Sequence, residues 1–335
     1  MYIIYALLAF SILIIIHELG HFVVAKLNGI YVEEFAIGMG PKLFGIKGKE
    51  TEYNLRVLPF GGFVRMLGED EDINDKRSFS SKTPIQKILV IAAGAFMNYV
   101  LALVIFAMFS FNFGFAETRI AEVVAGSPAE QVGLQVGDEF LKIDGHRIFT
   151  TDDLRMGIAM AKGSEVTIEV KRNGEKLIKQ VIPTIDEQGR ILIGITHESI
   201  ENPTFIQSIK QSFKETITMV SQTFQALKMI VTGEANLKTD VGGPITIIKM
   251  SGQAAKAGIW NLMYFVAFLS VQLAVFNLLP FPALDGGIIL IQLIELITRK
   301  KIPEKYIERI NTVGFMLLML LMVVVTLKDI IFPVL

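Results

Sequence analysis

The stretch His17-Glu18-Leu19-Gly20-His21 lies inside a run of residues that is otherwise apolar. Tyr2 to Ile16 precede it and Phe22 to Ala25 follow it, which makes a segment of about the twenty residues needed to cross a bilayer. Ionisable side chains inside such a segment are costly unless they are compensated, so they indicate function. On a helix, H-E-x-x-H places two imidazoles one turn apart beside a carboxylate. The stretch therefore predicts a zinc site inside a membrane.

The overall composition also indicates a membrane protein. Of the 335 residues, 52% are hydrophobic and 19% are charged, which is below the roughly 25% charged residues of soluble domains. The net charge of −1 and the lack of a basic stripe argue against a nucleic-acid partner. Because the chain has no cysteine, a metal site must use His and carboxylate ligands.

The first apolar segment is expected to stay in the protein as a membrane helix. No positively charged region precedes it and no small-residue cleavage site follows, so it does not match a cleaved signal peptide. Further apolar blocks alternate with stretches of soluble composition. We therefore predict an α-helical membrane protein with four transmembrane helices, a cytoplasmic membrane-associated β-sheet loop and one extracytoplasmic α+β domain. The predicted segments are 1–30 (helix with HELGH), 31–87 (β-rich loop), 88–113 (helix), 114–199 (outside domain), 200–257 (outside amphipathic helix and Gly-Gly-Pro linker), 258–287 (helix), 288–311 (cytoplasmic connection) and 312–335 (helix).

The distribution of Lys and Arg predicts the orientation in the membrane. Residues 33–87 carry nine Lys or Arg, and the connection before the last helix is also basic, with Arg299 and Lys301 among others. Positive charge favours the cytoplasmic side for short loops, whereas long regions are translocated regardless of charge. The HELGH motif and Asp285 then both lie near the cytoplasmic ends of their helices, and we expect them to meet.

Asp285 follows a segment that cannot be a regular helix. Pro280 and Pro282 remove backbone donors, and broken backbone at membrane depth is tolerated only inside protein or beside a wet cavity. One interpretation makes Asp285 the cap of a helix at 286–297. The other makes it the third ligand of a zinc ion, with His17 and His21. Three protein ligands leave a position open for water, as in catalytic zinc sites, and Glu18 would act as the general base.

The remaining segments allow more than one interpretation. Strands are predicted at Val32–Ile37, Thr51–Leu58 and Gly62–Leu67, forming either a simple connection or a sheet whose edge pairs with an extended substrate. Asn98, taken alone, is most easily explained as an interhelical hydrogen-bonding group. The helical stripe in 203–232, interrupted by lysines, predicts an amphipathic helix at the membrane interface.

The segment after the second membrane helix resembles a bacterial PDZ domain. Residues 126–145, GSPAEQVGLQVGDEFLKIDG, match that family's pattern, and strands and a helix at Thr151–Met160 are predicted around them. PDZ domains bind an extended peptide or a C-terminus along a sheet edge. His146 and His197 fall in this region and are expected to be surface residues.

Taken together, the motifs resemble the site-2 protease family of intramembrane zinc metalloproteases, and most closely its RseP-type bacterial branch. HELGH in a first helix, Gly94-x-x-x-Asn98 in a second, an outside PDZ domain, and N-x-x-P-x-P-x-L-D-G from Asn277 in a third carry the resemblance. It implies that Asn277 contacts the substrate backbone and that Asn98 supports the site. Gly61-Gly62-Phe63-Val64 resembles the branch's membrane-associated loop, which makes Phe63 a further candidate for substrate binding. The best-known members have two tandem PDZ domains, and this chain has room for one.

The resemblance implies hydrolysis of a peptide bond in the transmembrane segment of a single-span membrane protein, such as an anti-sigma factor or a remnant signal peptide. The implied location is a bacterial inner membrane, as a multi-pass protein with its active site near the cytoplasmic face and its PDZ domain outside. Two other functions stay open: a membrane metal transporter or binding protein with a PDZ adaptor, and an inactive scaffold. The transporter would need further His or acidic residues in the second and fourth helices, and the second helix has none.

Overall fold

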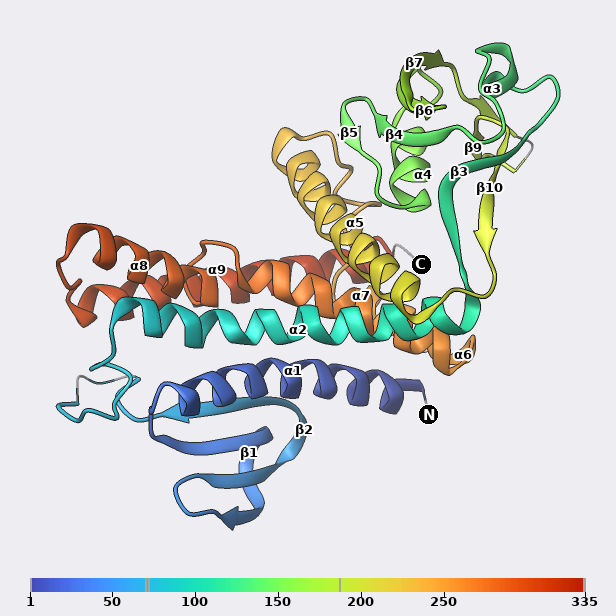
Figure 1. The fold of residues 1–335 in the computed structure, drawn as a ribbon. Helices are drawn as coiled ribbons and strands as arrows, with labels where there is room; N and C mark the ends of the chain where they lie inside the picture. Colours follow the sequence, from blue (N-terminus) through green and yellow to red (C-terminus); the bar gives the residue numbers. More distant parts are fainter. Residues whose placement is uncertain (1, 70, 72, 187, 334–335) are drawn as a thin grey trace. The chain divides into compact units, whose positions relative to one another are not determined.

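A computed structural model describes residues 2–69, 71, 73–186 and 188–333 and divides the chain into two compact units (Figure 1). Unit 1 comprises Met1–Ala102 and Gln225–Leu335, and unit 2 comprises Leu103–Phe224. Helices α2 (Pro84–Phe113) and α5 (Phe205–Thr232) each cross from one unit to the other.

Within the described residues, four helices are long and apolar enough to span a membrane. They are α1 (Tyr2–Leu27), α2, α7 (Ile259–Asn277) and α9 (Glu304–Ile331). Leu317 and Leu320 of α9 are more than half exposed, at 51% and 60%, as expected for side chains that face lipid. The α9 helix begins earlier than the predicted membrane segment at 312, because no helix breaker follows Pro303 and the polar residues simply extend the helix.

The linker predicted at the end of 200–257 is partly wrong, because it contains a helix. α6 (Pro244–Lys256) begins with a proline, which has no N–H to leave unpaired in the first turn. Two of the remaining N–H groups there, on Gly243 and Thr246, donate to the buried Asp329 carboxylate of α9 at 3.0 Å. A carboxylate from a distant helix thus completes the N-terminus of α6.

The β-rich loop folds differently from the three predicted strands. β1 (Val32–Lys47) and β2 (Glu52–Met66) are two long antiparallel strands that bend back on themselves. Ile37 pairs with both Gly62 and Leu55, and Phe44 also pairs with Leu55. The segment 32–37 therefore lies between 62–66 and 52–55, and 42–47 adds an outer piece that the sequence did not predict. Positive φ angles at Gly38, Gly40 and Gly61 allow these bends.

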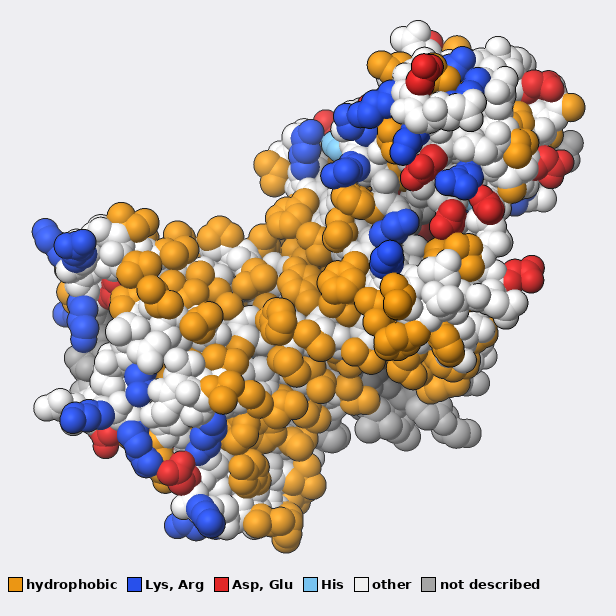
Figure 2. All heavy atoms as spheres, in the orientation of Figure 1, with side chains coloured by type: hydrophobic (Ala, Val, Ile, Leu, Met, Phe, Trp, Pro, Cys, Tyr) orange, Lys and Arg blue, Asp and Glu red, His pale blue; other side chains and the backbone are white. Residues whose placement is uncertain are grey.

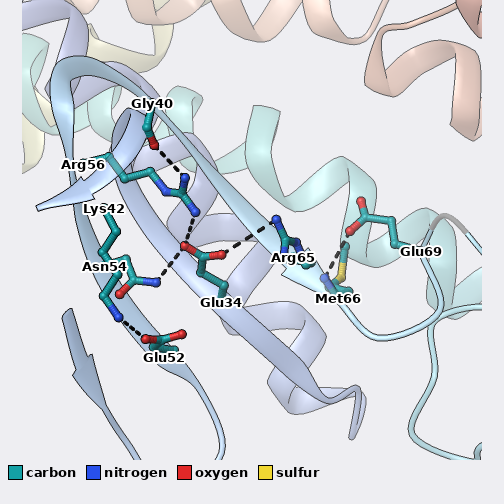
Figure 3. Close-up of polar contacts among 9 residues, drawn as sticks. All are labelled: Glu34, Gly40, Lys42, Glu52, Asn54, Arg56, Arg65, Met66 and Glu69. Carbon is teal, nitrogen blue, oxygen red and sulfur yellow. Dashed lines mark hydrogen bonds and ion pairs between the residues drawn. The ribbon is translucent and has the colours of Figure 1, made fainter. Parts of the chain in front are cut away.

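A buried carboxylate ties three segments of this sheet together (Figure 3). The Glu34 carboxylate accepts hydrogen bonds from Asn54 at 2.7 Å and Arg56 at 2.6 Å, and it lies 3.8 Å from Arg65. Burial alone would raise the pKa of Glu34, but the hydrogen bonds from Arg56 and Asn54 outweigh it and hold the pKa below its usual value. Glu34 is therefore charged and fixes the curled sheet beside α1.

Unit 2 contains a sheet with strand order β10-β3-β4-β6-β7, with β5 paired to β4. Its elements are β3 (Phe115–Val123), α3 (Pro128–Gln131), β4 (Glu139–Ile143), β5 (His146–Arg147), α4 (Thr151–Met160), β6 (Val166–Arg172), β7 (Glu175–Val181), β8 (Thr184–Ile185), β9 (Ile191–Leu192) and β10 (Ile195–Ile200). The core is built from buried apolar residues that include Ile120, Phe140, Leu154 and Ile168. The helix predicted at Thr151–Met160 is present with these bounds as α4, and strands precede and follow it as predicted.

The histidines of unit 2 differ in exposure. His146 is exposed, as predicted. The prediction for His197 is wrong in part, because its ring is half-buried edge-on against Phe140, with ring centroids 6.1 Å apart. Burial lowers the pKa of His197, so this side chain is a neutral packing group.

The apolar stripe of α5 faces outward along the described helix. Phe205, Phe213 and Phe224 are more than half exposed, whereas Ser212 and Thr218 are buried. An exposed apolar face on an otherwise polar helix suits a membrane interface, which is the position predicted for this segment.

Candidate metal centre

Three predicted ligands lie together in unit 1. His17 and His21 are one turn apart on α1, and Asp285 is the first residue of α8 (Asp285–Thr298). The two Nε2 atoms are 3.1 Å apart, and Oδ2 of Asp285 lies 3.2 Å from that of His17 and 3.7 Å from that of His21. Asp285 makes no capping hydrogen bond to α8, whose N-cap is Leu284. The geometry thus favours the ligand interpretation of Asp285 over the helix cap.

Small residues let α2 reach the two imidazoles. A Cβ on Gly94 would overlap Nε2 of His21 and lie 2.7 Å from Nε2 of His17. On the other side of the contact, a Cβ on Gly20 would overlap the carbonyl oxygen of Ala93. Glycine on both helices therefore permits the close crossing of α1 and α2 that surrounds the site.

The other nitrogen of each imidazole is held by a second helix. Nδ1 of His21 donates to the carbonyl oxygen of Val90 at 2.9 Å, which leaves its Nε2 with a free lone pair. Nδ1 of His17 lies 3.3 Å from the carboxamide of Asn98, whose Oδ1 is buried without a hydrogen-bond partner. Turning the carboxamide over brings Oδ1 to Nδ1, which then donates the hydrogen bond and frees Nε2 of His17 as well.

These donors fit a zinc ion. Oδ2 of Asp285 is buried without a hydrogen-bond partner, although it faces two imidazole nitrogens. A cation placed among one oxygen and two nitrogens would satisfy all three, because one ligand atom from each residue lies within 4.8 Å of the others. Two imidazoles and one carboxylate are the ligand set of a catalytic zinc site with an open fourth position.

Comparison with known proteins agrees with this donor set. The model of peptidase family M50 matches residues 5–321. The chain belongs to peptidase family M50. A Clostridium perfringens protein, provisionally named a zinc metalloprotease, is 68% identical over 335 residues and covers 100% of both chains. The zinc metalloprotease RasP of Geobacillus kaustophilus is 31% identical over 408 aligned positions, covering 97% of this chain and 96% of that protein.

This M50 chain is a zinc metalloprotease and, with its four apolar helices, an integral membrane protein. Among solved structures, the PDZ domain of an SdrC-like protein from Listeria monocytogenes matches with 27% identity and a TM-score of 0.23. The match covers 25% of this chain and 88% of that one.

Glu18 of this M50 peptidase lies where β2 passes along α1. Gly62 approaches so closely that a Cβ on it would lie 3.6 Å from Cγ of Glu18, and the backbone of Val64 has a hydrogen bond with the Glu18 carboxylate. The last residue of α7, Asn277, places its amide 3.4 Å from Nε2 of His17. The glutamate and the asparagine are thus next to the metal ligands.

Phe63 differs from the other predicted site residues of the M50 peptidase. Its ring lies between two guanidinium groups, with centroid distances of 4.7 Å to Arg56 and 5.6 Å to Arg65. These cation–π contacts hold the ring on the sheet. The structure therefore gives Phe63 contacts within the sheet, while its neighbours Gly62 and Val64 touch Glu18.

Several contributing groups in this M50 site were not predicted. Besides the carbonyl of Val90, the buried Ser270 hydroxyl of α7 donates to the carbonyl oxygen of Asn98 at 2.8 Å. Gly286 and Gly287 allow the turn before α8, because a Cβ on either would overlap carbonyl oxygens of the segment 278–281. The adjacent glycines could have indicated a tight turn from the sequence. A backbone carbonyl and a single serine have no sequence pattern that would indicate their role.

Proposed function

We propose that this zinc metalloprotease hydrolyses a peptide bond inside the transmembrane segment of a single-span membrane protein. The observation that carries the proposal is that His17, His21 and Glu18 lie on a helix apolar enough to span a membrane, with Asp285 beside them. An active site for a soluble substrate has no need of such a location. In a bacterium, an anti-sigma factor or a remnant signal peptide fits this class of substrate.

Each residue of the site has a separate role in the proposed hydrolysis. His17, His21 and Asp285 would hold a zinc ion, which would act as a Lewis acid toward the water and the scissile carbonyl. Glu18 takes the proton of the attacking water and later passes it to the leaving nitrogen. Asn98 holds His17 in the tautomer that binds metal, and Asn277 hydrogen-bonds the substrate backbone beside it.

The curled sheet offers a place for the unwound substrate. A helix hides its carbonyls in hydrogen bonds, so the segment must be extended to be cut. In the register, 62–66 of β2 pairs on one side with 32–37, and the backbone of Val64 in this segment has a hydrogen bond with the Glu18 carboxylate. An extended substrate that adds to this edge would bring its carbonyls to the metal centre, with Phe63 on the same strand.

The remaining assignments concern location. We place the protein in a bacterial inner membrane, with the metal centre near the cytoplasmic face and unit 2 outside, where the PDZ-like region would bind a peptide or C-terminus.

Replacement of the general base tests this function. Purified Glu18→Gln should retain zinc, because the ligands are intact, but lose cleavage of a single-span substrate by about 10²- to 10⁴-fold, the usual contribution of a general base. Metal analysis and quantitative cleavage assays measure the two effects. Glu234→Gln, an exposed acidic residue away from the site, is the matched control. Wild-type cleavage by Glu18→Gln would refute the mechanism.

A further inference from the structure

A cavity of about 990 Å³ lies in unit 1 beside α8, the helix that begins with Asp285. Its walls come from the segment after β2, from α8 and from the beginning of α9, including Glu69, Gln292 and Phe315. Ala283 and Ile288, which flank Asp285 in the chain, also line it. Figure 1 shows the α8–α9 turn and the loop that leads into α2 at the same end of unit 1. The cavity therefore extends from the neighbourhood of Asp285 toward that end.

One buried carboxamide, that of Gln292, belongs to a residue that lines this cavity. Gln292 is 5% exposed, and its Oε1 has no partner among the described residues. It lies on α8 two turns after Asp285 and therefore on the same face of the helix. A carboxamide carries both an acceptor and donors, so it is complementary to a peptide group. The buried Oε1 of Gln292 is thus an acceptor that a backbone N–H of a bound peptide could satisfy.

The charges of the cavity indicate which peptide fits. Three carboxylates line it, from Glu69, Glu295 and Glu308, against two ammonium groups, from Lys87 and Lys301. Glu308 is exposed and Glu295 is half-buried, where it accepts a hydrogen bond from the N–H of Ile302 at 2.8 Å. Carboxylates outnumber ammonium groups by one inside the cavity, so its lining favours a cationic segment although Lys and Arg gather on the outer surface at this end (Figure 2).

The flank of a membrane-spanning substrate on the cytoplasmic side is a cationic segment. Figure 2 shows Lys and Arg gathered at the end of unit 1 that holds the α8–α9 turn, beside the apolar surface of the helices. Positive charge of this kind is typical of the cytoplasmic side. By the same rule, the flank of a substrate that emerges there is rich in Lys and Arg.

We propose that the cavity is a specificity subsite for the Lys- or Arg-bearing flank of the substrate, which it holds in an extended form. Gln292 pairs with a backbone amide of the flank, and Glu295 and Glu308 attract its cationic side chains. The proposal rests on the proposed function. Seven residues of α8 separate Asp285 from Gln292, about 10 Å along the axis, which equals about three residues of extended chain. The amide that Gln292 recognises is thus about three residues from the scissile bond.

A set of single-span substrates that differ only at the flank tests the subsite. The flank positions three to five residues from the cut carry Lys, Gln or Glu. Wild-type protein should cleave the Lys substrate with a kcat/KM roughly tenfold above that of the Gln substrate, through KM, because charge complementarity acts on binding. In the double variant Glu295→Gln/Glu308→Gln the ratio should fall to about one. Glu234→Gln should keep the wild-type ratio.

Gln292→Leu tests the amide contact separately. Its volume is similar, and we expect kcat/KM to fall about tenfold for all three flanks, with zinc content unchanged. If this variant fails to fold, the exposed Glu308→Gln alone still tests the charge preference. In the Glu18→Gln background, a photo-crosslinker at position 308 should capture the substrate flank.

The possible outcomes distinguish failure of the proposed protease function from failure of the proposed subsite. If wild-type protein cleaves none of the substrates, the proposed function fails. If it cleaves all three equally, or if the preference survives in the double variant, only the subsite is refuted. Crosslinking of position 308 to an anionic lipid rather than to the substrate would also overturn it.

Discussion

Gly94 sets how closely α2 approaches the proposed zinc ligands. Because a Cβ at this position would overlap Nε2 of His21, even alanine must displace an imidazole or the whole helix. A shift of a few tenths of an ångström is enough to spoil a metal site, since ligand distances are fixed to about ±0.2 Å.

Gly94→Ala should therefore lose most of its bound zinc and at least about 100-fold in cleavage rate, because a small misplacement of catalytic groups already has this effect. Metal analysis of the purified protein and a cleavage assay measure both. Phe96→Ala on the same helix is the control, since its side chain is 63% exposed. Full zinc content in Gly94→Ala would contradict the proposed site.

Asn98 provides a second test at the residue scale. If its Oδ1 accepts the hydrogen bond from Nδ1 of His17, Asn98→Leu should weaken zinc binding by about 10- to 100-fold, as is usual when a group that orients a ligand is lost. Asn112→Leu is the matched control, because this exposed amide on α2 donates to the carbonyl of Met108 on its own helix. Zinc affinities come from competition with a chelator. Equal affinities in the two variants would exclude the orienting role.

The site residues that belong to a local sequence motif could be predicted, whereas those brought in by contacts between helices could not. His17, Glu18 and His21 form a local pattern, and Asp285 is unusual enough at the end of an apolar segment to be noticed. The partners of the Nδ1 atoms come from α2, and the carbonyl of Val90 exists in every residue type. Such contacts depend on how helices cross, which a single sequence does not encode locally.

At the scale of elements, a partly buried acid of α5 lies close to the carboxylates of α4 inside unit 2. Glu215 accepts a hydrogen bond from Gln211 at 2.8 Å, and its second oxygen is buried without a partner. Burial raises the pKa of Glu215 to about 7, and the nearby carboxylates of Asp152 and Asp153 raise it further against the opposing effects of Gln211 and Lys214. Next to it, the Thr218 hydroxyl donates to Asp153 at 2.7 Å.

This carboxyl should make the stability of unit 2 depend on pH. Its pKa is about 7 when folded and about 4.5 when unfolded, so the folded state binds more protons between these values. The free energy of unfolding should therefore fall as the pH rises from 4.5 to 7, by on the order of 3 kcal/mol. Glu215→Gln should remove this dependence and raise the melting temperature at pH 8.

Thermal unfolding of the full-length protein between pH 5 and pH 8 measures the effect. Glu198→Gln, on the exposed part of β10, should keep the wild-type pH dependence. If Glu215→Gln loses stability with rising pH as steeply as the wild type does, the carboxyl is not responsible.

Elements were predicted well where periodicity and breakers agree, as for α4 at Thr151–Met160. They were predicted poorly where contacts between residues far apart in the sequence determine the structure. The curl of β1 and β2 depends on the contacts of Glu34 with Asn54 and Arg56, which lie about twenty residues away. Helix α6 is short and relies on Asp329 from α9, so its own sequence gave little reason to expect it.

At the scale of the whole molecule, the predicted sidedness follows from charge alone and can be measured directly. The chain has no cysteine, so single cysteines can be introduced without a background. With a membrane-impermeant maleimide on intact bacterial cells, Lys176→Cys in unit 2 should be labelled at least about ten times more than Lys301→Cys in the connection before α9.

Permeabilised cells provide the control for this experiment, because both cysteines should then react. Both side chains are exposed in the structure, so access is limited only by the membrane. Equal labelling in intact cells would contradict the orientation, as would labelling of Lys301→Cys alone.

The distance along the chain between the two halves of the metal centre has a consequence for biosynthesis. His17 and His21 are synthesised before Asp285, which follows His21 by more than 260 residues. A nascent or prematurely terminated chain thus carries the imidazoles and the glutamate but lacks the carboxylate that completes the donor set. If Asp285 is the third ligand, as proposed, a chain that stops before α8 should have no proteolytic activity toward the membrane proteins made beside it.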